Sequence, residues 1–148
     1  MQNTNRKKDE EVLAEIYRNA QLALQSISNI LPQVEDAEIR TELVSQHEEY
    51  EKISSQASQL SKDLGYEVKE PNPFKKMMMW GSIKINSLTD NSRSHIAEMM
   101  VQGTVMGITA LKTSYRDMCE GANPEIRALC EEMIRMEETF EETWKSYL

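Results

Sequence analysis

Two long stretches of the chain repeat apolar residues every three or four positions, and this repeat restricts the possible fold more than any other feature of the sequence. In residues 11–31 and 36–64 the spacing matches one face of an α-helix that packs against other helices. The first stripe contains Leu13, Ile16, Ala20, Ala23, Ile27 and Ile30, and the second contains Ile39, Leu43, Gln46, Tyr50, Ile53, Ala57, Leu60 and Leu64. No stretch alternates apolar and polar residues for long enough to form a strand. We therefore predict an all-α fold.

Proline, glycine and capping residues mark where the predicted helices begin and end. Pro32 ends the first helix, Gly65 suits the left-handed end of the second, and Asn123 followed by Pro124 begins the last. We predict a single domain, 1–148, with long helices at 11–31, 36–64, 92–118 and 124–148 and a shorter helix at 74–88. The shorter helix is either an independent crossover or continuous with the third long helix. As a crossover, it would let the third long helix run parallel to the second in a four-helix bundle.

Composition narrows the class of protein further. The 17 lysines and arginines stand against 25 acids, a net charge of −8 with neutral histidines, which disfavours binding to nucleic acid. The polar N-terminus contains no apolar signal segment, and the longest apolar-rich stretch, 96–111, is shorter than the roughly 20 residues of a membrane span. We therefore expect a cytoplasmic protein, in which Cys119 and Cys130 are free thiols.

Two long helices, a helical crossover and two more long helices resemble the ferritin-like superfamily. The phrases SHIAEMMVQGTVMGITALK and EEMIRMEETFEETWKSYL also resemble small ferritin-like bundle proteins of Gram-positive bacteria. Catalytic members of the superfamily hold two iron ions with a Glu from each of two helices and an ExxH from each of the other two. Here Val44 and Ser92 stand three residues before His47 and His95, so neither histidine completes an ExxH. The resemblance thus implies a ferritin-like four-helix bundle that lacks the ferroxidase centre.

One histidine nevertheless stands in a pattern that suits a metal. His95 and Glu98 are spaced to share one helix face, and Glu137 or His47 from neighbouring helices would complete a site for iron or zinc. The alternative is that His95 forms hydrogen bonds in the first helical turn and that Glu98 is solvated. Glu137 is compatible with the inward stripe of the last helix, but Met136 fits that stripe equally well, so we expect Glu137 on the flank.

A GxxxG pair in the third long helix points to close packing. Gly103 and Gly107 each cost about 1 kcal/mol relative to alanine inside a helix, which the close approach of another helix would offset. The same helix is apolar on nearly every side, with Val101, Val105 and Ile108 on one of its faces. Either the crossover helix or a second subunit covers it, and we expect a homo-oligomer with these five residues at the interface.

Residues 74–88 are cationic in an acidic chain and rich in methionine. Lys75, Lys76 and Trp80 suit an anionic membrane or the groove of a protein partner, although the segment also suits a crossover helix packed on its own bundle. We expect a non-catalytic, self-associating structural or interaction protein that needs no cofactor. The alternatives are a repurposed metal-binding protein that uses His95 and Glu98, and a membrane- or partner-docking protein that uses 74–88.

Overall fold

The computed structural model describes residues 2–66, 90–117 and 122–148, and these residues form helices and their connections. The helices are α1 (Gln2–Ile30), the short 3₁₀ helix η1 (Leu31–Gln33), α2 (Ala37–Leu64), α4 (Arg93–Arg116) and α5 (Pro124–Lys145). No strand occurs in these three ranges. The all-α prediction is confirmed, and the predicted helix at 74–88 lies outside the described residues. No described helix combines the length and the apolar character that crossing a membrane requires.

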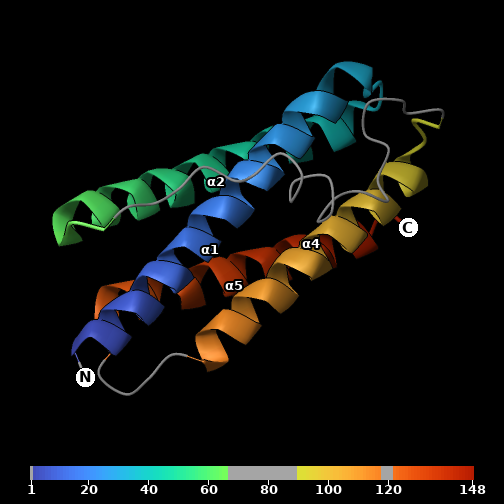
Figure 1. Ribbon diagram of the computed structural model, residues 1–148. Coiled ribbons are helices and arrows are strands. Elements are labelled where there is room, and N and C mark those ends of the chain that lie inside the picture. Colours follow the sequence, from blue (N-terminus) through green and yellow to red (C-terminus); the bar gives the residue numbers. More distant parts are fainter. Residues whose placement is uncertain (1, 67–89, 118–121) are drawn as a thin grey trace.

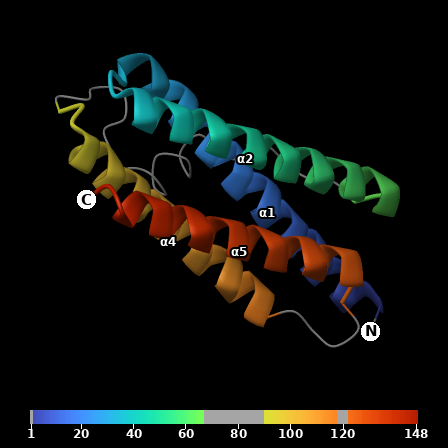
Figure 2. The same cartoon turned by 180° about the vertical axis from the view of Figure 1, so that it is seen from behind.

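The four long helices form a bundle of two antiparallel pairs (Figures 1 and 2). α1 packs mainly on α2 and α4 mainly on α5, with further contacts between α1 and α4, α1 and α5, and α2 and α5. Arg93, in the first turn of α4, pairs with Asp36 at the start of α2, with 2.8 Å between Nε and Oδ2. α2 and α4 therefore begin at the same end of the bundle and run parallel, as the predicted crossover topology requires. The chain termini lie at opposite ends (Figure 1).

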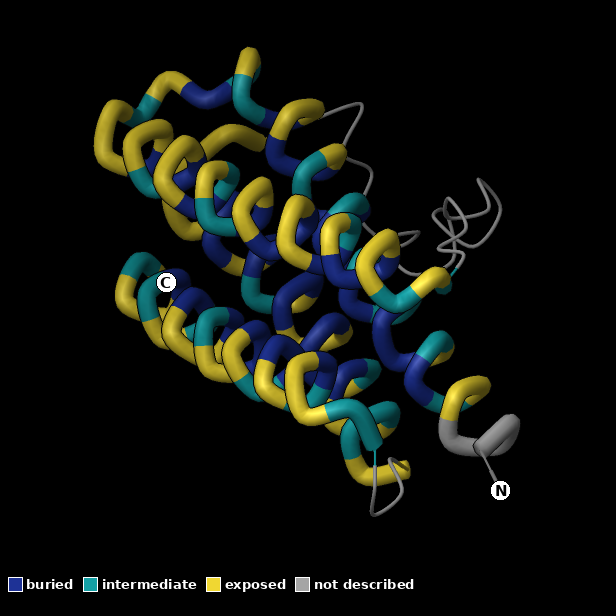
Figure 3. The backbone as a smooth tube through the Cα atoms, turned by 90° about the vertical axis from the view of Figure 1, so that its left-hand side faces the viewer, coloured by how far each residue is buried: buried dark blue, intermediate teal, exposed yellow. Residues whose placement is uncertain are grey.

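The predicted apolar stripes form the core of the bundle. Every residue of the first two stripes is buried except Leu64, which packs on the edge of the core. Buried positions line the inner face of each helix and exposed positions the outer face (Figure 3). Most of the buried apolar residues belong to one hydrophobic cluster, so each helix is stabilised mainly by its contacts with the others.

The first helix begins nearer the N-terminus than we predicted, at Gln2 rather than near Glu11. Its charged side chains bind the ends of other elements. Lys8 Nζ donates to the carbonyl of Asp117 at the end of α4, at 3.0 Å, and the Asp9 carboxylate accepts from the backbone N–H of Asn123. Arg6 donates to the carbonyl of Gly65 after α2. These contacts hold the polar first turns of α1 against the ends of neighbouring helices, and this explains why the helix extends beyond its apolar stripe.

Capping residues begin three of the helices, and the predicted cap at Asn123 and the predicted helix end at Gly65 are both confirmed. Asp36, Ser92 and Asn123 each accept a hydrogen bond from a backbone N–H in the first turn of the following helix, and Gly65 ends α2 with a φ of 70°. A positive φ of this size is readily adopted by glycine because it has no β-carbon.

Replacing Asn123 with alanine is expected to destabilise the protein by about 1 kcal/mol. The amide oxygen of Asn123 accepts from the N–H groups of Glu125 and Ile126 at 2.9 and 3.3 Å, and alanine leaves both donors without this partner. Urea unfolding followed by circular dichroism measures the change. Asn123→Ser is the matched control, because serine keeps an oxygen at the cap and is expected to retain most of the stability. Equal losses in the two variants would contradict a capping role.

Candidate functional site: a buried carboxyl group in the bundle

The structure buries Glu137, and our prediction that it lies on the flank of the last helix is wrong. Glu137 is 3% exposed, whereas Met136 is only partly buried at the edge of the core. The inward stripe of α5 is therefore the one that passes through the carboxyl group, and it contains Ile126, Cys130, Met133, Glu137, Phe140 and Trp144. Asp9 and Glu137 are the two buried acids among the described residues, and Asp9 has a backbone N–H as its partner.

Side chains from the middle of two other helices approach the Glu137 carboxyl group. The hydroxyl of Tyr50 on α2 donates to Glu137 Oε2 at 2.9 Å, and the Tyr50 ring also packs on Phe140, with 5.5 Å between the ring centroids. Asn19 on α1 is 5% exposed, and its amide oxygen and both carboxyl oxygens of Glu137 lie within 3.3 Å of the position that a β-carbon of Gly107 would occupy. The second carboxyl oxygen, Oε1, has no hydrogen-bond partner in the part of the chain that the structure describes.

α4 provides the space for this carboxyl group through Gly107. A β-carbon at Gly107 would lie 2.8 Å from Glu137 Oε2, 3.2 Å from Oε1 and 3.3 Å from Asn19 Oδ1. Carbon and oxygen atoms without a bond between them do not approach within 3 Å without a shift of one of them. Gly107 therefore accommodates polar side chains of α5 and α1, rather than the backbone of another helix as we expected.

Burial controls the ionisation of the group. It raises the pKa of Glu137 to about 8, and the hydrogen bond from Tyr50 acts in the opposite direction. The same burial, together with the neighbouring Glu137, raises the pKa of Tyr50 well above its usual value. Burial therefore favours the protonated form of both groups.

A second polar contact joins α2 and α5, the two helices that Tyr50 and Glu137 connect. The indole N–H of Trp144 donates to Gln46 Oε1 at 2.9 Å, and the amide nitrogen of Gln46 donates to Glu42 Oε1 at 2.9 Å. Trp144 is fully buried and Gln46 is 1% exposed. The two polar positions in the stripe of α2, Gln46 and Tyr50, are thus the ones that bind α5.

The other metal candidates have separate surroundings. Ser92 caps the backbone N–H of His95, whose side chain is half-buried in the first turn of α4, and Glu98 is exposed. His47 lies on the surface between α1 and α2, with Nδ1 2.7 Å from Glu51 Oε1 and Nε2 3.3 Å from Ser28 Oγ. A metal bound through His47 would displace one of these contacts. Within the described ranges, no three His, Cys, Asp or Glu side chains gather as a metal site would require.

The residues around Glu137 do not fit a di-iron centre of the kind found in catalytic ferritin-like proteins. Such a centre needs several ionised carboxylates and two histidines facing one another. Glu137 instead faces a tyrosine hydroxyl, an amide and a glycine, and burial favours its neutral form. These surroundings do not suit Glu137 as an iron ligand.

The predicted interface residues of α4 divide between core and surface. Gly103, Gly107 and Ile108 are buried within the chain, Val101 is half-buried and Val105 is 39% exposed. Met106, beside Val105, is 37% exposed. A surface for a second copy would therefore consist of Val101, Val105 and Met106 rather than the glycine pair. Lys75, Lys76 and Trp80 lie outside the described residues, as does Cys119.

Cys130 is a free thiol in the core and is a poor candidate for chemistry. Its sulfur is 3.8 Å from the carbonyl oxygen of Leu111, and burial raises its pKa to about 12. The thiolate is the nucleophilic form of cysteine, so a thiol with such a high pKa is unreactive at neutral pH.

A shallow groove of about 380 Å³ lies between the second half of α2 and the first half of α5. Leu60 and Leu129 contribute apolar surface, and Asp63, Glu125 and Glu132 contribute carboxylates. This lining favours a cationic over an anionic ligand.

Comparison of the chain with models of protein families, with curated proteins and with solved structures finds no match. The sequence analysis named Glu137 as a possible metal ligand but missed its burial and its hydrogen bond with Tyr50, although one signal was present. The α5 stripe that passes through Glu137 continues at steps of three and four residues on both sides of it, and α2 carries two polar residues in an otherwise apolar stripe.

Proposed function

We propose that the chain is a non-catalytic structural and interaction protein of the cytoplasm: a ferritin-like four-helix bundle that associates with a second copy of itself. Two antiparallel helix pairs, with α2 and α4 parallel, support the ferritin-like part of the proposal. A buried, hydrogen-bonded acid whose neutral form is favoured by burial stands where a ligand cluster would be needed, and this supports a structural role for the bundle interior.

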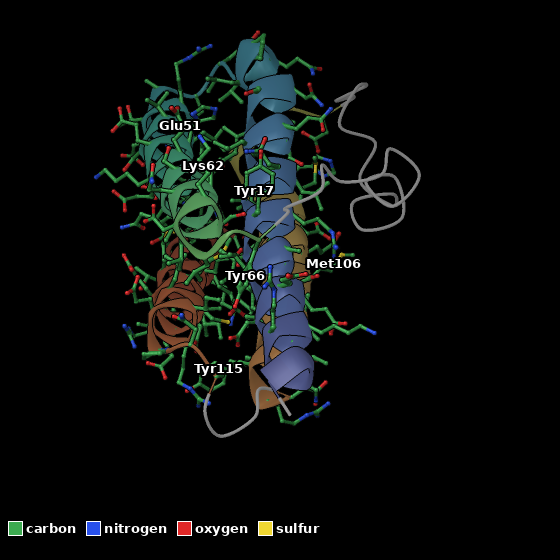
Figure 4. The ribbon with its side chains drawn as sticks, turned by 60° about the vertical axis from the view of Figure 1, so that its left-hand side comes forward. Tyr17, Glu51, Lys62, Tyr66, Met106 and Tyr115 are labelled. Atoms are coloured by element: carbon green, nitrogen blue, oxygen red, sulfur yellow. The ribbon has the colours of Figure 1, made fainter. Side chains whose placement is uncertain are left out.

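The observation that carries the self-association is the apolar outer surface in the middle of α4. Val105 and Met106 are consecutive, each more than one third exposed, and Val101 lies one turn before Val105. Figure 4 places Met106 on the opposite side of the molecule from Glu51 of α2. Burial of these side chains against the same surface of a second copy would remove apolar area from water.

Native mass spectrometry and light scattering of the untagged full chain test this proposal. We expect a dimer that the double substitution Val105→Glu/Met106→Glu converts into a monomer with unchanged helical circular dichroism. Val44→Glu is the matched control, because Val44 is 42% exposed on α2, and it is expected to leave the dimer intact. A wild-type protein that stays monomeric across a concentration series would contradict the proposal, and so would a dimer that the double substitution leaves unchanged.

Native mass spectrometry and vesicle co-sedimentation separate this function from its two alternatives. A metal-loaded species that disappears in His95→Ala would replace the proposal with the metal-binding function. Co-sedimentation with anionic vesicles that is lost in Lys75→Glu/Lys76→Glu would replace it with docking to a membrane. The protein is purified without a chelator so that a bound metal is retained.

A further inference from the structure

One carboxyl oxygen of Glu137, Oε1, is buried and has no hydrogen-bond partner among the described residues, although buried polar atoms in folded proteins are normally paired. This oxygen lies in the bundle interior, apart from the α4 surface proposed for self-association. An unpaired buried polar group destabilises a folded protein, so an oxygen left unpaired in the middle of the bundle requires an explanation.

The hydrogen bonds around Asn19 fix the orientation of its amide group. Asn19 Nδ2 donates to the backbone carbonyl of Glu15 at 3.0 Å and to Glu15 Oε1 at 3.1 Å. Both partners only accept hydrogen bonds, so the NH₂ group must point toward them. The amide oxygen, Oδ1, consequently lies on the side of Gly107 and Glu137, close to the position where a β-carbon of Gly107 would be.

The hydrogen bond from the Tyr50 hydroxyl shows that Glu137 Oε2 is an acceptor. Tyr50 has one proton and donates it to Glu137 Oε2, so Oε2 acts as an acceptor. Glu137 Oε1 and Asn19 Oδ1 lie 3.2 and 3.3 Å from the position of the missing β-carbon, and within the described residues Oε1 has no hydrogen-bond partner. A proton on Oε1, directed at Oδ1, would give Oε1 a hydrogen bond.

Among the residues that the structure describes, no charged group balances a negative charge on Glu137. α2 presents the neutral Tyr50, and α4 presents Gly107, which has no side chain. α1 presents Asn19, behind which the carboxylate of Glu15 pairs with Arg18. On the outer side of α5, the neighbouring Glu138 pairs with Lys112 of α4. Within the described residues, Glu137 itself has no ion pair.

We propose that the middle of the bundle is a proton-binding site, in which Glu137 holds a proton on Oε1 and donates it to Asn19 Oδ1. The hydrogen bonds then run from Tyr50 on α2 through Glu137 on α5 to Asn19 on α1, with Gly107 of α4 leaving room for them. Loss of the proton places an unbalanced negative charge against an amide oxygen in the core. The packing of α5 on α1 and α2 is therefore proton-dependent and weakens as the pH rises.

The direction of the pH effect follows from the pKa. Burial raises the pKa of Glu137 from 4.5 to about 8, so between these values the folded protein holds a proton that the unfolded chain has released. The stabilisation is complete at low pH, declines as the pH rises from 4.5, and is lost above about 8. A single proton of this kind raises the unfolding equilibrium constant about tenfold per pH unit.

Glu137→Gln separates this effect from the titration of the other acids. Glutamine has the shape of the protonated acid, since its oxygen can accept from Tyr50 and its NH₂ group can donate to Asn19. The ratio of wild-type to variant unfolding constants, measured in urea, is expected to rise about tenfold per pH unit between pH 5 and pH 7. A ratio that does not change over this range would overturn the proposal.

Infrared difference spectroscopy observes the proton directly. The wild-type minus Glu137→Gln spectrum at pH 7 is expected to contain the carbonyl stretch of a protonated carboxylic acid, and this band should disappear on alkaline titration. The matched control is Glu132→Gln, an exposed position on the same helix, whose difference spectrum is expected to show an ionised carboxylate. Carboxylate bands for Glu137 at pH 7 would overturn the proposal.

Variants on either side of the carboxyl group test the assignment of its two oxygens. Tyr50→Phe removes a donor to the ionised form, so the infrared titration should move to higher pH. Asn19→Ala removes the acceptor of the acid proton, so the titration should move to lower pH. Shifts of both variants in the same direction would contradict the assignment of the proton to Oε1.

Discussion

Replacement of Trp144 by alanine is expected to destabilise the protein by about 4 kcal/mol, a large part of the 5–15 kcal/mol of a typical domain. The indole is fully buried in the core, and its N–H donates to Gln46 across the α2–α5 contact. Alanine leaves a cavity and also removes the donor to a Gln46 oxygen that water does not reach. Urea or thermal unfolding, followed by circular dichroism, measures the loss.

Two further variants separate the cavity from the hydrogen bond. Trp144→Phe keeps most of the ring but leaves Gln46 Oε1 unpaired, which is expected to cost about 1–3 kcal/mol. Adding Gln46→Leu to Trp144→Phe removes the unpaired oxygen and should recover part of that loss. A Trp144→Ala protein that loses less than about 1 kcal/mol would show that the indole is not packed as described.

Gly107→Ala is also expected to change the free energy of unfolding strongly, and the sign of that change tests the contact with Glu137. Inside an ordinary helix this substitution stabilises by about 1 kcal/mol, because alanine has the higher helix propensity. Here the new β-carbon lies 2.8 Å from Glu137 Oε2 and 3.2 Å from Oε1. The carboxyl group is buried and bound to Tyr50, so it can move aside only by disturbing that bond. We expect a net destabilisation of about 2 kcal/mol.

The control for this prediction is the same substitution made in a Glu137→Ala background. With the carboxyl group removed, a β-carbon at position 107 no longer meets either of its oxygens, so Gly107→Ala should stabilise that background by about 1 kcal/mol. Chemical unfolding of the four proteins in this double-mutant cycle gives the coupling energy between the two positions. Stabilisation of the wild type by Gly107→Ala would contradict the close contact with Glu137.

The ends of the helices and the apolar surfaces that pack together could be predicted from local sequence. Asp36, Ser92 and Asn123 cap the residues that follow them, and this chemistry depends only on neighbours in the chain. The start of α1 could not be predicted in this way. Residues 2–10 are polar, and the groups that Lys8 and Asp9 bind are more than one hundred positions away in the sequence.

On α5, the choice of the inward residue likewise depends on distant contacts rather than on local sequence. Met136 and Glu137 lie about 100° apart around α5, so a stripe with a spacing of three and four residues is compatible with either as the inward residue. Hydrophobicity favours Met136. The structure nevertheless buries Glu137, because Tyr50 supplies a donor and Gly107 supplies space, and both come from other helices.

The sequence by itself therefore determined an all-α chain, the places where most of its helices begin and end, and the apolar faces that they bury. These features depend on periodicity and on caps, which act over a few residues. Only the tertiary structure decided that Glu137 enters the core and that Gly107 leaves room for its carboxyl group. Those outcomes depend on whether a donor, an acceptor and a space from three distant segments meet at one point, and no local pattern contains that information.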